Sequence, residues 1–209
     1  MGNPRSAKIA LRLRSGDIEK PWQAFLDSNQ GAQVGFLKIF LQGFAFRTLS
    51  PSRRIVFASA VRVGMAKALV TEVEGESVEV DLPASERFFA GGSTTVRGFA
   101  LDRLGTAETI SSTGFPLGGN GVLILNAELR VPLWRDVGVV GFMDGGNVFA
   151  RVSDFDLTEL RFTPGVGLRY RSPIGPIRFD VGFKLNPREL SPGRFESQAV
   201  YHVSVGHAF

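Results

Sequence analysis

The feature that most constrains the fold is an alternation of apolar and charged side chains, which recurs in stretches of about ten residues along the chain. It is clearest over residues 177–184, where the apolar residues are Ile177, Phe179, Val181 and Phe183 and the intervening ones are Arg178, Asp180, Gly182 and Lys184. The same pattern runs through residues 54–66, 122–131 and 165–171. Because successive side chains of a β-strand point to opposite faces, this period predicts strands with one apolar and one charged face. The sequence therefore predicts an all-β fold whose neighbouring strands, joined by short turns, run antiparallel.

Both a soluble β-sandwich and a transmembrane β-barrel alternate in this way, and two features favour the barrel. Strands of about ten residues have the length that a tilted strand needs to cross a bilayer. In addition, the polar face carries full charges while the other face is almost purely aliphatic and aromatic; the charged residues are Glu128, Arg130, Arg169, Arg171, Arg178, Asp180 and Lys184. This contrast fits a wet lumen and a lipid-facing exterior. We expect about eight strands, with a short turn over residues 132–136.

Composition excludes several classes of function. The chain has no cysteine and only two histidines, His202 and His207, which argues against disulfides, thiolate sites and a multi-histidine metal site. Its formal net charge is +4, but lysines and arginines are spread singly, so we expect no nucleic-acid partner. We also expect no metal and no cofactor. The Gly-x-Ser-x-Gly elbow of serine hydrolases is absent, and we expect no enzymatic activity.

A long connection over residues 67–118 contains the glycine-rich stretch 87–99. Its spacing matches neither the dinucleotide-binding nor the P-loop pattern. Four of its residues are apolar and favour packing over exposure to water: Phe88, Phe89, Val96 and Phe99. If the loop folds back into the barrel, Arg97 needs carboxylate partners. Glu128 and Asp144 on the next two strands are the candidates, although each could instead pair with another lumenal arginine.

Several ordered motifs in this half of the chain resemble the Omp85 family of outer-membrane proteins. Val96-Arg97-Gly98-Phe99 is similar to the family's lumenal loop motif, and Phe142 to Val148 is similar to its Phe-x-Asp-x-Gly strand. Glu128 lies in a segment that resembles the family's glutamate strand, and residues 165–180 resemble its penultimate hairpin. The resemblance implies that the loop over residues 87–118 folds into the lumen and that Arg97 contacts Glu128 and Asp144.

The C-terminal segment also resembles a family feature, the β-signal by which outer-membrane barrels are recognised for insertion. The matching residues are Tyr201, Val203, Val205, Gly206 and Phe209. His207 stands where an apolar residue is more usual. An ordinary closing strand is the alternative interpretation. As an edge, this strand could pair with a partner strand by β-augmentation.

The resemblance implies that residues 1–209 are an Omp85-type β-barrel domain without a periplasmic POTRA domain. Eight strands would make either half of the family's sixteen-strand barrel or a minimal barrel. The implied function is insertion or translocation of proteins at the bacterial outer membrane; the alternative is a passive pore or structural barrel. The implied partners are outer-membrane lipid, β-barrel or secreted client proteins, periplasmic accessory proteins and, by self-association, further copies of the chain.

Overall fold

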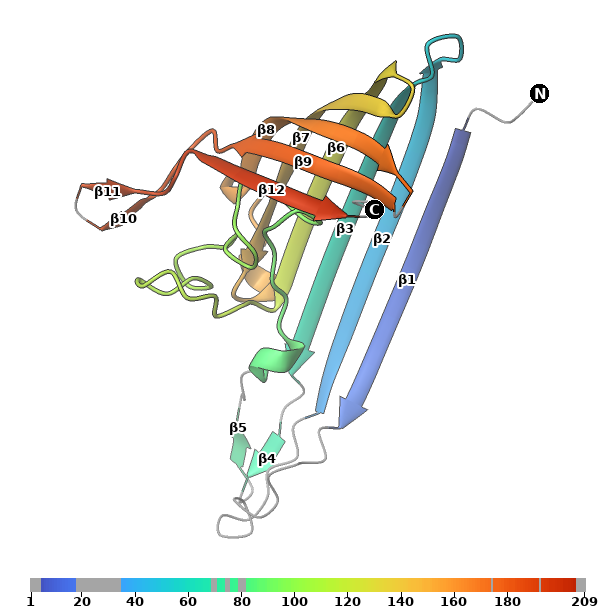
Figure 1. Cartoon of the computed structure of the whole chain (residues 1–209). Coiled ribbons are helices and arrows are strands. Elements are labelled where there is room, and N and C mark those ends of the chain that lie inside the picture. Colours follow the sequence, from blue (N-terminus) through green and yellow to red (C-terminus); the bar gives the residue numbers. More distant parts are fainter. Residues whose placement is uncertain are drawn as a thin grey trace.

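The computed structural model describes residues 5–17, 35–68, 71–73, 76–78, 82–173, 175–191 and 193–205 (Figure 1). Eight strands form one antiparallel sheet in the order β1-β2-β3-β6-β7-β8-β9-β12. Their bounds are β1 Arg5–Asp17, β2 Gly35–Ser50, β3 Ile55–Ala68, β6 Gly121–Trp134, β7 Val137–Phe149, β8 Arg161–Ser172, β9 Gly175–Phe183 and β12 Ala199–Val205. Two small hairpins lie outside this sheet: β4 Thr71–Val73 with β5 Glu76–Val78, and β10 Glu189–Ser191 with β11 Arg194–Phe195. The predicted all-β, antiparallel fold is confirmed.

The sheet is open, and β1 and β12 are its two edges. Within the described residues, β1 pairs with β2 alone and β12 pairs with β9 alone. Each remaining strand has a neighbour on both sides, and all neighbours are antiparallel. An edge strand presents unpaired backbone N–H and C=O groups, so both ends of the sheet are able to accept another strand.

The predicted alternation is confirmed on the strands that carry it most clearly. On β9, Arg178 and Asp180 are buried on the inner face, whereas Phe179 and Phe183 are exposed on the outer face. Strands β2, β3, β6, β7, β8 and β12 also expose large apolar side chains on the outer face; among them are Leu37, Leu41, Phe57, Val61, Met65, Leu129, Met143, Phe162, Val166, Leu168 and Tyr201. A sheet with an apolar outside and a charged inside is the inverse of a soluble sandwich and matches a membrane barrel.

The two ends of the sheet differ in their connections. Short turns join β2 to β3, β6 to β7 and β8 to β9, and we call this the short-turn end (Figure 1). At the opposite end the connections are long. The predicted turn over residues 132–136 is wrong in its extent, because β6 continues to Trp134 and only Arg135 and Asp136 separate it from β7. The register shifts between Pro132 and Trp134, and such an irregularity accommodates a proline that cannot donate to the ladder.

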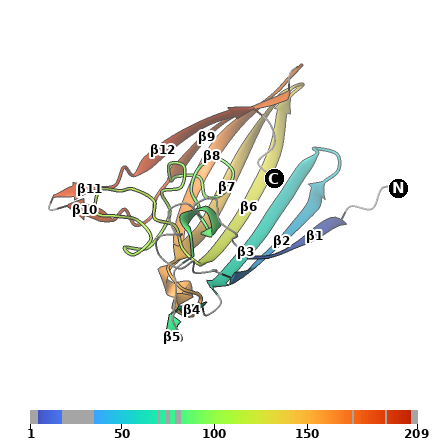
Figure 2. The same cartoon turned by 90° about the horizontal axis from the view of Figure 1, so that it is seen from below.

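Residues 82–120, which we call the inner loop, lie against the inner face of the sheet (Figure 2). The buried apolar cluster is shared between this loop and strands β2, β3, β6 and β7; its loop members are Leu82, Phe88, Ala90, Val96, Phe99 and Leu104. The loop has no regular structure beyond a 3-10 turn at Ala84–Glu86. Further 3-10 turns are Val152–Asp154 and Leu157–Glu159. In the described part of the chain, no helix has the length and apolar character needed to span a membrane. The apolar core therefore lies between the sheet and the inner loop, which is part of the connection from β3 to β6.

Candidate functional site: an ion-pair network on the inner loop

Arg97 of the inner loop meets Asp144 of β7 through three hydrogen bonds. Its Nε and Nη2 donate to the two carboxylate oxygens at 2.6 and 2.8 Å, and its backbone N–H donates to Oδ2 at 3.0 Å. Arg97 is 2% exposed and Asp144 is fully buried. A bidentate pair of this kind has the fork geometry that makes arginine–carboxylate contacts strong and directional.

Two further carboxylates complete the environment of this guanidinium. Its Nη1 donates to Glu128 Oε1 on β6 at 2.5 Å and lies 3.9 Å from Asp180 Oδ1 on β9. Glu128 also accepts from Arg130 at 2.8 Å, and Asp180 accepts from Arg169 Nη1 at 2.7 Å. Carboxylates from three strands of the sheet therefore surround Arg97.

An aromatic ring and an amide close the remaining sides of the network. The Arg97 guanidinium carbon lies 3.6 Å from the centroid of the Phe142 ring, a cation–π contact in a site from which water is excluded. The Asn126 amide donates to Asp144 Oδ1 at 2.8 Å and to the backbone carbonyl of Thr95 at 2.7 Å. Arg62 of β3 donates to the Asn126 oxygen at 2.8 Å, which extends the network to a further strand.

Gly98 allows the loop backbone to touch the wall of the sheet. Its φ is +102°, and a Cβ there would lie 2.7 Å from Cγ2 of Thr163 on β8. Gly182 on β9 faces the same contact, since a Cβ on it would lie 2.6 Å from the Gly98 nitrogen. The Gly98 N–H donates to Nε2 of His202 on β12 at 3.4 Å. Two glycines without side chains thus bring the loop within reach of the last strand.

The flanking apolar residues of the motif are also buried. Val96 is fully buried and Phe99 is 1% exposed. The Phe99 ring packs under two cations, Arg161 at 4.5 Å and Lys184 at 5.0 Å. Arg161 in turn pairs with Glu196, which lies in the connection before β12. The motif therefore contacts the sheet through its apolar residues as well as through Arg97.

The electrostatics of the network keep Arg97 charged at every accessible pH. Burial alone would lower the pKa of its guanidinium, but the hydrogen bond and charge of Asp144, with the charges of Glu128 and Asp180, raise it above the ordinary value. Arg97, Asp144 and Glu128 are each at most 2% exposed, so no substrate reaches them. Such an arrangement holds two segments together and offers no free acid, base or nucleophile.

The structure brings most of the predicted site residues to one place. Val96, Arg97, Gly98 and Phe99 gather with Glu128 and Asp144 on the inner face. Tyr201, Val203 and Val205 lie apart from them, on the outer face of the edge strand β12. Gly206, His207 and Phe209 lie outside the described residues. In the described part of the chain, no group of three or more His, Asp or Glu residues is arranged to hold a metal ion.

Sequence reasoning assigned no role to Asp180, Gly182 or Asn126, and it placed Phe142 only in the Phe-x-Asp-x-Gly resemblance. The Phe142 ring lies on the inner face with Asp144, and its stacking on Arg97 accounts for an aromatic residue there. Asp180 stood on a charged face as one residue among several. Its register opposite Gly167 of β8, where the absent side chain leaves room for Arg169 to reach it, appears only in the folded sheet.

Comparison with known proteins places this geometry in a family. The Omp85 superfamily domain matches residues 24–209. The chain is 29% identical over 187 residues to the outer membrane protein assembly factor BamA of Nitratidesulfovibrio vulgaris, with 87% of this chain and 22% of that protein covered. It is 26% identical over 165 residues to a SAM50-like protein of Schizosaccharomyces pombe, with 73% and 32% covered. The chain thus spans less than a third of either relative.

A solved structure supports the same fold. The crystal structure of BamA from Haemophilus ducreyi lacking POTRA domains 1–3 matches with a TM-score of 0.59 at 18% sequence identity, covering 83% of this chain and 38% of that one. The match shows that the sheet has the fold of part of a β-barrel. The chain therefore belongs to the Omp85 superfamily and is an outer-membrane β-barrel protein.

Proposed function

We propose that this chain is the barrel of a machine that inserts β-barrel proteins into the outer membrane or translocates proteins across it. The observation that carries the proposal is the edge that β12 forms in the sheet of the described residues, beside a loop that is fixed to the inner face by the Arg97 network. A free edge can template an incoming strand by β-augmentation. The relative from Nitratidesulfovibrio vulgaris is named an assembly factor for outer-membrane proteins, which agrees with this activity.

In this mechanism the Arg97 network does not contact the client; it fixes the inner loop to the sheet beside β12. Arg97 holds the inner loop to β6, β7 and β9, while Gly98 reaches His202 on β12 through a single long hydrogen bond of 3.4 Å. The interior of the sheet is thereby braced, and β12 is held to it by its ladder with β9 and by the hydrogen bond from Arg178 to Ser204. A client strand that pairs with the other edge of β12 gains backbone hydrogen bonds along that edge.

The alternative, a passive pore, receives less support from the structure. The inner loop packs its apolar residues against the inner face of the sheet, on the side that would line a pore. The proposal includes no catalytic step, and the expectation that the chain is not an enzyme remains a prediction. Outer-membrane lipid, client proteins, periplasmic accessory proteins and self-association are proposed partners in the same sense.

The absence of native cysteine makes a site-specific cross-linking test clean. Val203→Cys on β12 and Val166→Cys on β8 place a thiol on the outer face at residues that are 72% and 61% exposed. Only the first lies on an edge strand. With the full-length protein in vesicles, we expect a client barrel carrying a cysteine in its terminal strand to form a disulfide with position 203 and not with position 166. Equal adducts at both positions, or ion conductance without client folding, would overturn the proposal.

A further inference from the structure

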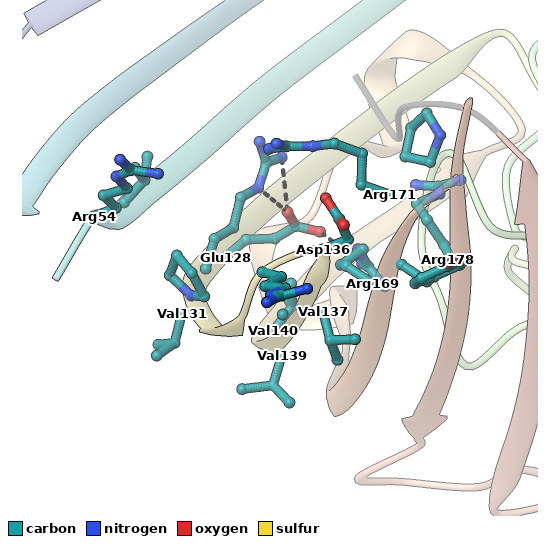
Figure 3. A pocket seen from close by; sticks show the side chains of 17 residues that line it. Arg54, Glu128, Val131, Asp136, Val137, Val139, Val140, Arg169, Arg171 and Arg178 are labelled. Carbon is teal, nitrogen blue, oxygen red and sulfur yellow. Dashed lines mark hydrogen bonds and ion pairs between the residues drawn. The ribbon is translucent and has the colours of Figure 1, made fainter. Parts of the chain in front are cut away.

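A second site lies on the inner face, at the short-turn end and away from the inner loop. It is a pocket of about 310 Å³ between the ends of β6, β7, β8 and β9 (Figure 3). Its ionisable residues are six arginines and two carboxylates, a formal excess of four positive charges; they are Arg54, Arg130, Arg135, Arg169, Arg171, Arg178, Glu128 and Asp136. The hydrogen bond from Arg97 accounts for the burial of Glu128, but the Arg97 network gives no role to the excess positive charge of the pocket.

The carboxylates nearest the deep end of the pocket are engaged in part. Glu128 accepts from Arg97 at 2.5 Å and from Arg130 at 2.8 Å. Asp180, just beyond the pocket, accepts from Arg169 at 2.7 Å through Oδ1, while its Oδ2 has no hydrogen-bond partner among the described residues. The positive charge of Arg178 is therefore not matched by a direct ion pair within the described residues.

Arg178 is buried with donors that make no hydrogen bond. It is 3% exposed, and its Nη2 donates to Ser204 Oγ at 2.7 Å. Its Nε and Nη1 have no hydrogen-bond partner among the described residues, and neither has Nη2 of Arg169, which lies 3.7 Å from Glu128 Oε1. A buried guanidinium normally has its donors satisfied, because leaving a charged donor unpaired costs more than any neutral one. Arg169 and Arg178 are both among the residues that line the pocket, whose volume is large enough for a small anion.

The position of the pocket along the strands also bears on its ligand. Trp134 and Tyr170 lie on the outer face on either side of Val137, in register with it, and Trp134 is 73% exposed. Aromatic residues of this kind mark the membrane–water interface in outer-membrane barrels. The pocket is therefore at the depth of lipid phosphates and open to water-borne anions.

We propose that Arg169 and Arg178 line an oxyanion site that takes a phosphate group at the short-turn end of the lumen. A tetrahedral phosphate presents enough oxygens to accept from both guanidinium groups at once, which a planar carboxylate in the same pocket does less completely. The phosphate comes either from free inorganic phosphate or from a phospholipid headgroup. Arg178 also donates to Ser204 of β12, but the evidence for the site does not depend on the function proposed above.

Titration of inorganic phosphate tests the proposal directly. The full-length protein in neutral detergent and phosphate-free buffer is titrated by calorimetry, beside Arg178→Gln and the matched control Arg53→Gln. Arg53 carries the same charge in the exposed β2–β3 turn at the same end and does not line the pocket. We expect one phosphate per barrel, affinity reduced about tenfold or more by Arg178→Gln, and unchanged affinity in the control.

Two further arms keep the test decisive. Arg171→Gln alters an exposed pocket residue, so it folds even if Arg178→Gln does not, and we expect it to weaken phosphate binding. In vesicles of phosphatidylcholine with phosphatidylglycerol, retained phosphate binding identifies the free anion as ligand, and lost binding identifies the headgroup. Absence of phosphate binding in detergent, or equal weakening by Arg53→Gln and the pocket variants, would overturn the site.

Discussion

Replacing Arg97 by methionine tests whether the inner loop is held by charge or by packing. Methionine keeps an apolar stem against the Phe142 ring but removes all guanidinium donors. Glu128 retains Arg130 as a partner at 2.8 Å. Asp144 loses its two side-chain bonds from Arg97 and keeps the Asn126 amide and the backbone N–H of residue 97. The cost is therefore concentrated on one fully buried carboxylate.

The magnitude follows from the burial of that carboxylate. Breaking a buried ion pair by removing one partner typically costs about 3–5 kcal/mol, because an uncompensated charge is left in a poorly solvated site. We expect Arg97→Met to lower the free energy of unfolding by that amount. Removing the second charge with Asp144→Asn should recover much of the loss, since no buried charge is left and the amide oxygen still accepts one of the two remaining hydrogen bonds, from Asn126 or from the backbone. The double variant should then be only about 1–2 kcal/mol less stable than the native chain.

The assay is equilibrium unfolding by urea of the full-length protein in phospholipid vesicles, applied to both single variants and the double variant. Arg53→Met is the control, and as an exposed turn substitution it should change stability by less than about 0.5 kcal/mol. A double-mutant cycle isolates the coupling between the two residues. If the two single losses simply add in the double variant, Arg97 and Asp144 are not coupled and the bracing role assigned to the pair is refuted.

Three other predictions follow from the same region and its surroundings. Gly98→Ala places a side chain at a φ of +102° and against β8, so it should destabilise the barrel by about 1–3 kcal/mol and speed proteolysis of the inner loop. Gly43→Ala is the control, because a Cβ there meets nothing within 4 Å, and it should have neither effect. Phe142→Leu should cost about 2 kcal/mol or more in urea unfolding, because the guanidinium of Arg97 loses its aromatic face; full retention of stability would show that the ring is only a spacer. Burial alone would raise the pKa of Glu196, but the hydrogen bonds and the charge of Arg161 on β8 lower it. A carboxylate whose pKa is lowered by folding stabilises the protein at pH values above its unfolded pKa of about 4.3, and this stabilisation is lost as the pH falls through the folded pKa. Glu196→Gln should therefore flatten the acid side of the curve of unfolding free energy against pH.

The strands of this chain were predictable because the alternation of apolar and charged residues along a single strand identifies which side chains lie on each face. On β9 the period-2 alternation identified both the apolar outer side chains and the charged inner ones, and the folded sheet agrees. The boundaries were less predictable where a strand departs from ideal pairing. Pro132 reads as a turn residue, yet β6 passes through it because the register shift leaves its missing N–H without consequence.

The members of the Arg97 network beyond the motif were not predictable from sequence spacing. Asp180 and Asn126 come near Arg97 only because four strands are in a particular register and the sheet curves around the loop. Phe142 shares the inner face with Asp144, and the alternation along β7 gives no reason for a phenylalanine at that position. Its cation–π contact with Arg97 supplies the reason, and recognising that contact requires knowing where the cation lies.

The network also bears on why the inner loop and the sheet form one unit. Glu128, Asp144 and Asp180 project from β6, β7 and β9 toward one point, and three buried carboxylates without a counter-charge would repel each other and pay the full cost of desolvation. Arg130 and Arg169 offset this partly from the sheet, but the cation that hydrogen-bonds Asp144 among the described residues comes from the loop. The loop therefore stabilises this arrangement of strands, and it has little regular structure of its own that would order it without the sheet. Each stabilises the other, so a client strand arriving at β12 meets an edge whose neighbouring wall is already rigid.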